Sequence, residues 1–240
     1  MPTPDQLTRE HQKAVNQVAS AVVKRLTRLL RAVDPSDIDA WFVKHERDIV
    51  EMIHDGWKAN RSLAAIYLRD HAAANKTFTT VHQAFFNRDQ VRTSVMVTGP
   101  IRFKQAVANG GTPETALKLM REAVGGAAYR HTANGSRDTV MNTVKHSRTI
   151  RGYRRVSDGN PCAFCAMLIS RGAVYQKETA SFQAHDKDGC MPAPEYRPPG
   201  TYKETGEAAR LFQLWKDSGA QDLTGKAAIA AFRAALNDQR

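Results

Sequence analysis

Apolar residues recur every three or four positions along the first third of the chain, the period of an α-helix with one buried face. The first such stretch contains Val15, Val18, Val22, Val23, Leu26, Leu29, Leu30 and Val33. It stops at Asp34-Pro35, because proline disfavours helical geometry in the residue before it. Ser36 can cap a second helix, whose predicted buried face is Ile38, Trp41, Phe42, Ile49, Met52, Ile53 and Trp57.

Helical signals continue to about residue 150. Thr112-Pro113-Glu114 is typical of a helix start, since proline in the first turn loses no hydrogen bond. Asn134-Gly135 predicts a break, after which Ser136 can cap a separate helix from about Arg137 to Arg148. We find no convincing run of alternating polar and apolar residues that would indicate β-strands. The pattern therefore predicts a mainly α fold, with residues 1–150 as a helical region.

The character of the sequence changes near residue 151. Turn-forming residues begin the new segment and proline-rich runs end it: Ser157-Asp158-Gly159-Asn160-Pro161, Pro192-Ala193-Pro194 and Pro198-Pro199-Gly200. We interpret residues 151–200 as a small loop-rich module. Two helical stretches, Ala208–Lys216 and Ala227–Leu236, follow it. They predict a C-terminal helical tail over residues 201–240, too short to bury much by itself and so expected to dock on another surface.

Composition narrows the class of protein. The chain has 240 residues, of which 42% are hydrophobic, as expected for a folded protein. An excess of 35 basic over 24 acidic residues gives a net charge of +11, which favours acidic partners. No apolar stretch approaches the roughly 20 residues of a membrane span, and the N-terminus lacks the apolar region of a secretory signal. With three cysteines, a disulfide scaffold is not expected.

All three cysteines lie in the loop-rich module with one nearby histidine. Cys162-x2-Cys165 is followed by His185-x4-Cys190, a spacing compatible with a zinc-knuckle-like Cys3His structural site. Asp186 and Asp188 are close enough to replace His185 as the fourth ligand. Two other interpretations stay open: buried cysteines without a metal, and a reactive thiol at Cys162 or Cys165 with His185 as its base.

Five cations follow one another closely across the boundary between the helical region and this module: Lys145, Arg148, Arg151, Arg154 and Arg155. They could form a solvated surface, or they could contact DNA or an acidic partner without reading sequence. Catalytic signatures are lacking: the chain has no GxSxG, HExxH or Walker motif. A hydrolase would have to assemble its residues from scattered positions.

The cysteine segment also resembles a known family. The run Arg154-Arg155-Val156-Ser157-Asp158-Gly159-Asn160-Pro161-Cys162-Ala163-Phe164-Cys165-Ala166-Met167-Leu168 is similar to the Mu-F-like minor capsid, or head morphogenesis, proteins of tailed actinobacterial phages. Further similarity lies in Gly135–Thr139, Ser170–Tyr175, His185 with Gly189-Cys190, and Ala231–Leu236. The specific part covers residues 135–240. Asp188 stands where the family's His–Cys–Gly–Cys-like cluster carries another residue.

The resemblance implies a structural component of the phage head. Its partners would be the portal and major capsid proteins, with the scaffold protein and packaged DNA as further candidates. Its location would be the capsid interior or portal region of the virion, and the host cytoplasm during assembly. Some relatives are described as capsid maturation proteases, so that activity is the alternative function. A basic DNA-binding accessory protein of the virion is a second alternative.

Overall fold

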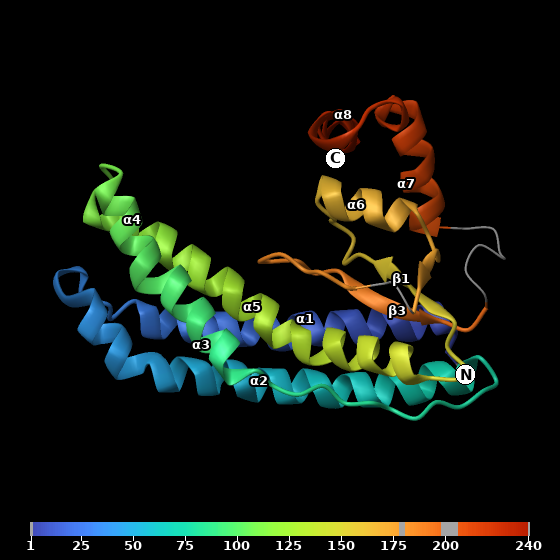
Figure 1. The fold of residues 1–240 in the computed structure, drawn as a ribbon, viewed down its shortest axis with the longest axis horizontal. Helices are drawn as coiled ribbons and strands as arrows, with labels where there is room; N and C mark the ends of the chain where they lie inside the picture. The colour runs from blue at the N-terminus through green and yellow to red at the C-terminus, as the bar shows by residue number, and fades with distance from the viewer. Residues whose placement is uncertain (1, 178–180, 198–205, 240) are drawn as a thin grey trace.

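Three long helices lie side by side along the long axis of the molecule (Figure 1): α1 (Pro4–Leu30), α2 (Ile38–Ala74) and α5 (Pro113–His146). The computed structural model describes residues 2–177, 181–197 and 206–239. The apolar stripes of α1 and α2 meet α5 in one core that includes Leu26, Phe42, Ile53, Met120 and Val124. The prediction of a mainly α fold is therefore confirmed.

The connection between α1 and α2 differs slightly from the prediction. A short 3₁₀ turn, η1 (Pro35–Asp37), separates the two helices, and its cap is Asp34. Asp37, rather than Ser36, caps α2, since its carboxylate accepts a hydrogen bond from the Ala40 N–H at 3.4 Å. Carboxylates are as effective as hydroxyls at the N-cap position, so α2 begins one residue later than predicted and the fold is unchanged.

Shorter helices cover the end of the bundle that lies away from the N-terminus. α3 (Arg88–Met96) leads through a π-helical turn, η2 (Val97–Ile101), into α4 (Arg102–Ala108). Gly99 and Pro100 are buried in this turn, and a Cβ at Gly99 would overlap the Phe42 ring. A glycine is therefore required where the turn crosses α2.

The predicted helix break at Asn134-Gly135 was wrong. α5 continues from Pro113 to His146, with Thr112 as its N-cap. A Cβ at Gly135 would overlap the carbonyl of Trp57, so this glycine lets α5 approach the α2 backbone closely. Ser136 does not cap a helix; it is buried and shares a 2.8 Å hydrogen bond with His11 of α1. Small residues here serve helix–helix packing, which a single sequence does not distinguish from a break.

A small antiparallel sheet, absent from the prediction, lies on the bundle near its N-terminal end (Figure 1). Its strand order is β2-β1-β3, with β1 (Gly152–Val156) in the centre, β2 (Tyr175–Gln176) and β3 (Met191–Glu195). β3 carries Pro192 and Pro194, opposite Arg155 and Tyr153 of β1. Prolines are tolerated because β3 is an edge strand, whose outer side needs no ladder hydrogen bonds. All five β3 residues are buried, so the strand has no polar–apolar alternation to detect.

The C-terminal helices share a core with the cysteine segment. α6 (Ala163–Ser170), α7 (Gly206–Asp217) and α8 (Gly225–Asp238) surround a second cluster that contains Cys165, Cys190, Leu211 and Phe232. A short turn, η3 (Ala220–Asp222), joins α7 and α8. Both predicted tail helices are present, and the surface on which they dock is α6. Pro198-Pro199-Gly200, and with it the boundary drawn at residue 200, lies outside the described residues.

Candidate metal centre

The first two cysteines lie on the first turn of α6. Cys162 is the N-cap of this helix, and its Sγ accepts a 3.4 Å hydrogen bond from the Cys165 N–H. Cys165 follows three residues later and is buried, whereas Cys162 is exposed. A Cys-x2-Cys pair on a helix start points both sulfurs to the same side, as a metal knuckle requires.

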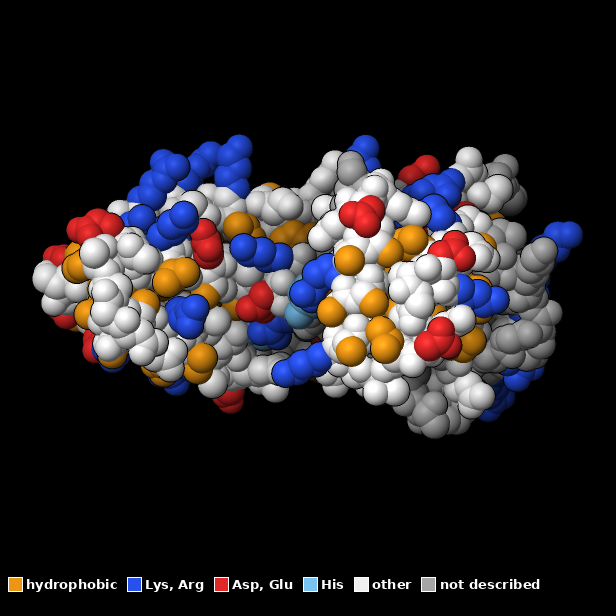
Figure 2. Space-filling view, turned by 90° about the horizontal axis from the view of Figure 1, so that it is seen from above, with side chains coloured by type: hydrophobic (Ala, Val, Ile, Leu, Met, Phe, Trp, Pro, Cys, Tyr) orange, Lys and Arg blue, Asp and Glu red, His pale blue; other side chains and the backbone are white. Residues whose placement is uncertain are grey.

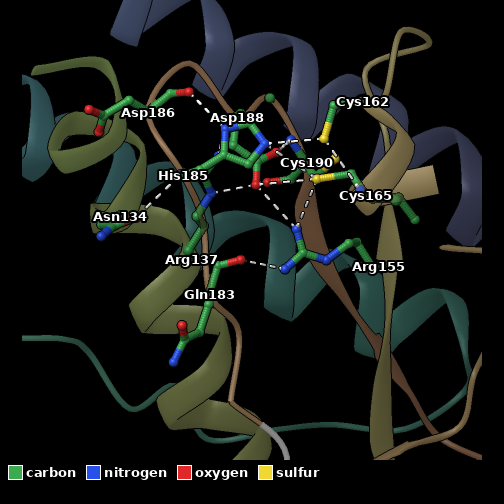
Figure 3. Close-up of polar contacts among 12 residues, drawn as sticks. Asn134, Arg137, Arg155, Cys162, Cys165, Gln183, His185, Asp186, Asp188 and Cys190 are labelled. Atoms are coloured by element: carbon green, nitrogen blue, oxygen red, sulfur yellow. Dashed lines mark hydrogen bonds and ion pairs between the residues drawn. The ribbon is translucent and has the colours of Figure 1, made fainter. Parts of the chain in front are cut away.

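The loop before β3 supplies the other side chains (Figure 3). The His185 Nε2 atom lies 3.3 Å from Cys162 Sγ and 3.7 Å from Cys165 Sγ. The ligand atoms of Cys165, Asp188 and Cys190 form an overlapping group, all within 4.8 Å of one another. Tetrahedral zinc with S and N ligands at 2.0–2.3 Å places neighbouring ligand atoms about 3.5 Å apart. Cys162, Cys165, His185 and Cys190 thus form a cluster that could hold a metal such as zinc.

Hydrogen bonds orient the histidine for this role. His185 Nδ1 lies 2.8 Å from the carbonyl oxygen of Asp186, to which it donates in the tautomer that leaves Nε2 free as a ligand. The Asp186 carboxylate points away from the cysteines (Figure 3). It pairs with Arg130 at 2.7 Å. Asp186 is therefore engaged elsewhere and is not a suitable fourth ligand.

Asp188 is engaged as well. One carboxylate oxygen accepts the Cys190 N–H at 2.8 Å, and the other lies 3.2 Å from Arg155 Nη1. Burial raises the pKa of Asp188, but Arg137 and the Cys190 hydrogen bonds outweigh it and hold that pKa below its usual value. An ionised carboxylate with both oxygens occupied favours His185 over Asp188 as the fourth ligand.

Two buried arginines surround the cluster. Arg155 is 5% exposed, contacts Asp188 and lies 3.7 Å from Cys165 Sγ. Arg137, from α5, is 1% exposed and donates to the carbonyl oxygens of Asp188 and Cys190. The Asp188 carboxylate compensates one of the two guanidinium charges. If the three thiols were neutral, the other guanidinium would be a buried charge without a counter-ion, which is costly in free energy. Three thiolates and a divalent metal carry a net charge of −1 and would balance it. The donor set and its surroundings therefore fit a zinc–thiolate centre.

The pKa values weigh against a reactive thiol. A hydrogen bond with the Cys165 thiol, together with burial, raises the pKa of Cys162 to about 12. The bond with Cys162 lowers the pKa of Cys165, but the Cys190 thiol and burial outweigh it and raise that pKa to about 12 as well. Nucleophilic cysteines instead have lowered pKa values, because the thiolate is the reacting form. Without a bound metal ion, these thiols resist ionisation.

Two residues that hold the His185–Cys190 loop have no role predicted from the sequence. Arg137 binds the loop backbone from α5, and Gln12 of α1 donates to the Gly189 carbonyl at 2.8 Å. Arg137 lies inside the motif Gly135–Thr139, but a single arginine on a helix gives no local signal of such a contact. Gln12 lies 177 residues before Gly189 in the chain, so no local sequence pattern could indicate their contact. The loop is thus held by two helices of the bundle.

The five cations selected from the sequence do not share one environment. Lys145, Arg148 and Arg151 are exposed. Arg154 is half-buried and pairs with Asp5 and with Glu195, and Arg155 is a buried part of the cysteine cluster. Only the first three present their charge to solvent.

Comparison with known proteins gives one family. A family model described as "VG15 protein" matches residues 1–218, which includes the whole cysteine cluster. This match indicates a phage-associated protein. No curated protein and no solved structure matches the chain. Within the described residues, no helix has the length and apolar character needed to cross a membrane.

Proposed function

This chain belongs to the VG15 protein family, and we propose that it is a minor capsid protein that acts in phage head morphogenesis as a structural component. Its location would be the capsid interior or the portal region, with the portal and major capsid proteins as partners. The scaffold protein is a further candidate partner. Family membership supports the phage association, and the cysteine cluster supports the structural role.

The position of the cysteine cluster, between α6 and the helix bundle, is the observation that supports a structural role. Cys162 and Cys165 come from α6, which packs against α7 and α8, whereas the His185–Cys190 loop is bound by Arg137 and Gln12 of the bundle. A zinc ion held by all four side chains would tie the C-terminal helices to the bundle. A site with four protein ligands has no open position for water, so it stabilises structure and does not hydrolyse bonds.

The C-terminal helices also present apolar surface. Figure 2 shows hydrophobic atoms gathered over the part of the molecule where α6, α7 and α8 lie. Phe164, Phe212 and Leu223 are each between 45% and 49% exposed. Exposed apolar groups of this kind support a protein-binding surface, and a zinc centre held by Cys162 and Cys165 would fix the α6 part of it.

The alternative function, a capsid maturation protease, needs a nucleophile and a base that a substrate can reach. The one serine–histidine pair with a short hydrogen bond among the described residues is Ser136 with His11, and both are buried in the bundle. A groove of about 900 Å³ between α1 and β1 is lined by Ser20 and Ser157, but by no described histidine or cysteine. Ser157 donates to the Glu207 carboxylate at 2.6 Å. These contacts favour the structural role.

Phage particles assembled with and without this chain would test the proposal. We expect particles that lack it to show a defect in assembly or DNA delivery, with unchanged termini of the major capsid protein in mass spectrometry. Loss of one specific cleavage, restored by wild type but not by a single serine, cysteine or histidine variant, would instead establish the protease.

A further inference from the structure

An extended segment, residues 75–87, runs back along the bundle from the end of α2 to the start of α3 (Figure 1). We call it the strap. It is attached to the end of α5 and to the turn that follows. The His82 N–H donates to Thr143 Oγ1 at 3.0 Å, and the Thr149 hydroxyl donates to the Phe78 carbonyl at 3.0 Å. The backbone at Phe78 is therefore held in place.

This attachment brings together two stretches that lack acidic residues. Residues 71–88 and residues 139–157 contain no Asp and no Glu, although Asp70, Asp89 and Asp138 border them. Of these, Asp138 lies close enough to Lys145 for the two charges to interact. Their contact is direct, since the rings of His82 and His146 lie 5.0 Å apart. We give the name basic face to six exposed or half-buried residues that these two attached segments contribute: Lys76, Phe78, His82, Lys145, His146 and Arg148.

Phe78 is the unusual member of the basic face. Its side chain is 79% exposed, although its backbone is anchored to Thr149, a neighbour of the exposed Arg148. An exposed aromatic ring on an anchored backbone gains little for folding, because its apolar area stays in water. The arrangement suits a partner that has both negative charge and flat rings.

We propose that the basic face binds DNA, with the cations on phosphates and the Phe78 ring against a base or sugar. This inference goes beyond the structural role in the head and does not depend on the metal. Lysine is depleted in the cores of protein–protein interfaces, whereas lysine and arginine dominate phosphate contacts. Aromatic rings add stacking with bases regardless of sequence. The chemistry therefore favours a nucleic acid over an acidic protein surface.

The basic face differs from the cationic surface predicted from the sequence. Arg154 and Arg155 are engaged with carboxylates and are not part of it. Lys76, Phe78 and His82 belong to it, although they precede Lys145 by 63 to 69 residues in the chain. Arg151 is also exposed, but its N–H bonds to the Glu195 carbonyl at the sheet, so the experiment leaves this residue unchanged.

Fluorescence anisotropy with the full chain tests the proposal. The probes are a labelled 30-base-pair duplex of arbitrary sequence and the matching single strand, each measured from 50 to 300 mM salt. The test variant combines Lys76→Ala, Lys145→Ala and Arg148→Ala. We expect its affinity for both probes to fall at least tenfold, with the slope of log affinity against log salt reduced by about 2 to 3.

A matched control removes equal charge at the other end of the bundle: Arg31→Ala, Arg102→Ala and Lys118→Ala, all exposed positions. It should bind nearly as wild type does. Phe78→Ala should weaken single-strand binding about fivefold or more with an unchanged salt slope, and Phe78→Tyr should restore it. Equal losses in the two triple variants would overturn the proposal. So would salt-independent binding, or binding of an acidic polypeptide such as polyglutamate in preference to both DNA probes.

Discussion

The guanidinium of Arg155 lies 3.2 Å from the carboxylate of Asp188, and both side chains are buried beside the cysteines (Figure 3). This pair links β1 to the loop that carries His185 and Cys190. It also places a hydrogen-bond donor 3.7 Å from Cys165 Sγ, where it would stabilise a thiolate. The surroundings of the cluster are therefore arranged for an anionic centre.

The first prediction is one zinc per chain. Cys162, Cys165, His185 and Cys190 should bind it, and Cys190→Ser should lose both the metal and the packing of α6 with α7 and α8. Structural zinc supplies on the order of 10 kcal/mol of apparent binding free energy, so the loss should be large. Elemental analysis and thermal unfolding with and without a chelator measure it. Three thiols freely alkylated in native buffer, with no stoichiometric metal, would contradict the assignment.

The second prediction concerns Arg155 as a residue that positions and compensates the centre. Arg155→Met should lower the zinc affinity by about 10- to 100-fold, because Asp188 is left buried without its partner. Arg130→Met is the matched control, since Arg130 pairs with the more exposed Asp186, and exposed pairs contribute about 0–1 kcal/mol. Chelator competition gives both affinities, and absorption spectra of the cobalt form report the coordination. Equal affinities for the two variants would argue against the role.

The third prediction tests the close contact of α5 with α2. Gly135→Ala should lower the free energy of unfolding by about 1–3 kcal/mol, because its methyl group would overlap the Trp57 carbonyl. Gly125→Ala, in the same helix, places its Cβ 3.5 Å from Val23, an ordinary contact. That control should be neutral or stabilising by up to about 1 kcal/mol, since alanine favours helix. Urea unfolding measures the free energy of unfolding of both variants. A similar decrease in both would exclude the steric explanation.

The fourth prediction is a loss of stability in mild acid. Burial lowers the pKa of His11 to about 3 and the pKa values of His71 and His131 to about 4. Between the ordinary value of 6.5 and these pKa values, the unfolded chain takes up protons that the folded chain does not. Stability should therefore be complete above pH 6.5 and fall below it, by up to about 1.4 kcal/mol per pH unit for each histidine.

Denaturant unfolding of wild type and His11→Gln from pH 7.5 to 4.5 measures this effect. The variant should show a shallower pH dependence, because one buried titrating group is gone. His146→Gln, the same substitution at an exposed histidine, is the matched control. Identical slopes for wild type and His11→Gln would mean that acid acts elsewhere, for example through loss of the metal.

The sequence alone determined the helical character of the chain and the composition of the cysteine cluster. Helical periodicity in α1 and α2 is a local property, since one side of each helix must be apolar to be buried. The Cys-x2-Cys pair is also local, because one helix turn positions both sulfurs. These features could be read without knowing which segments meet.

The tertiary structure decided what depends on contacts between distant segments. Gly135 fits a continuous helix because Trp57 lies against it, and Pro192 and Pro194 fit a strand because β3 is at an edge. The same holds for charge: Arg154 and Arg155 are adjacent to the exposed cations in sequence, yet Asp5 and Asp188 engage them. Burial and ion pairing depend on partners more than 30 residues away, and no local sequence pattern shows which of these residues will be in contact.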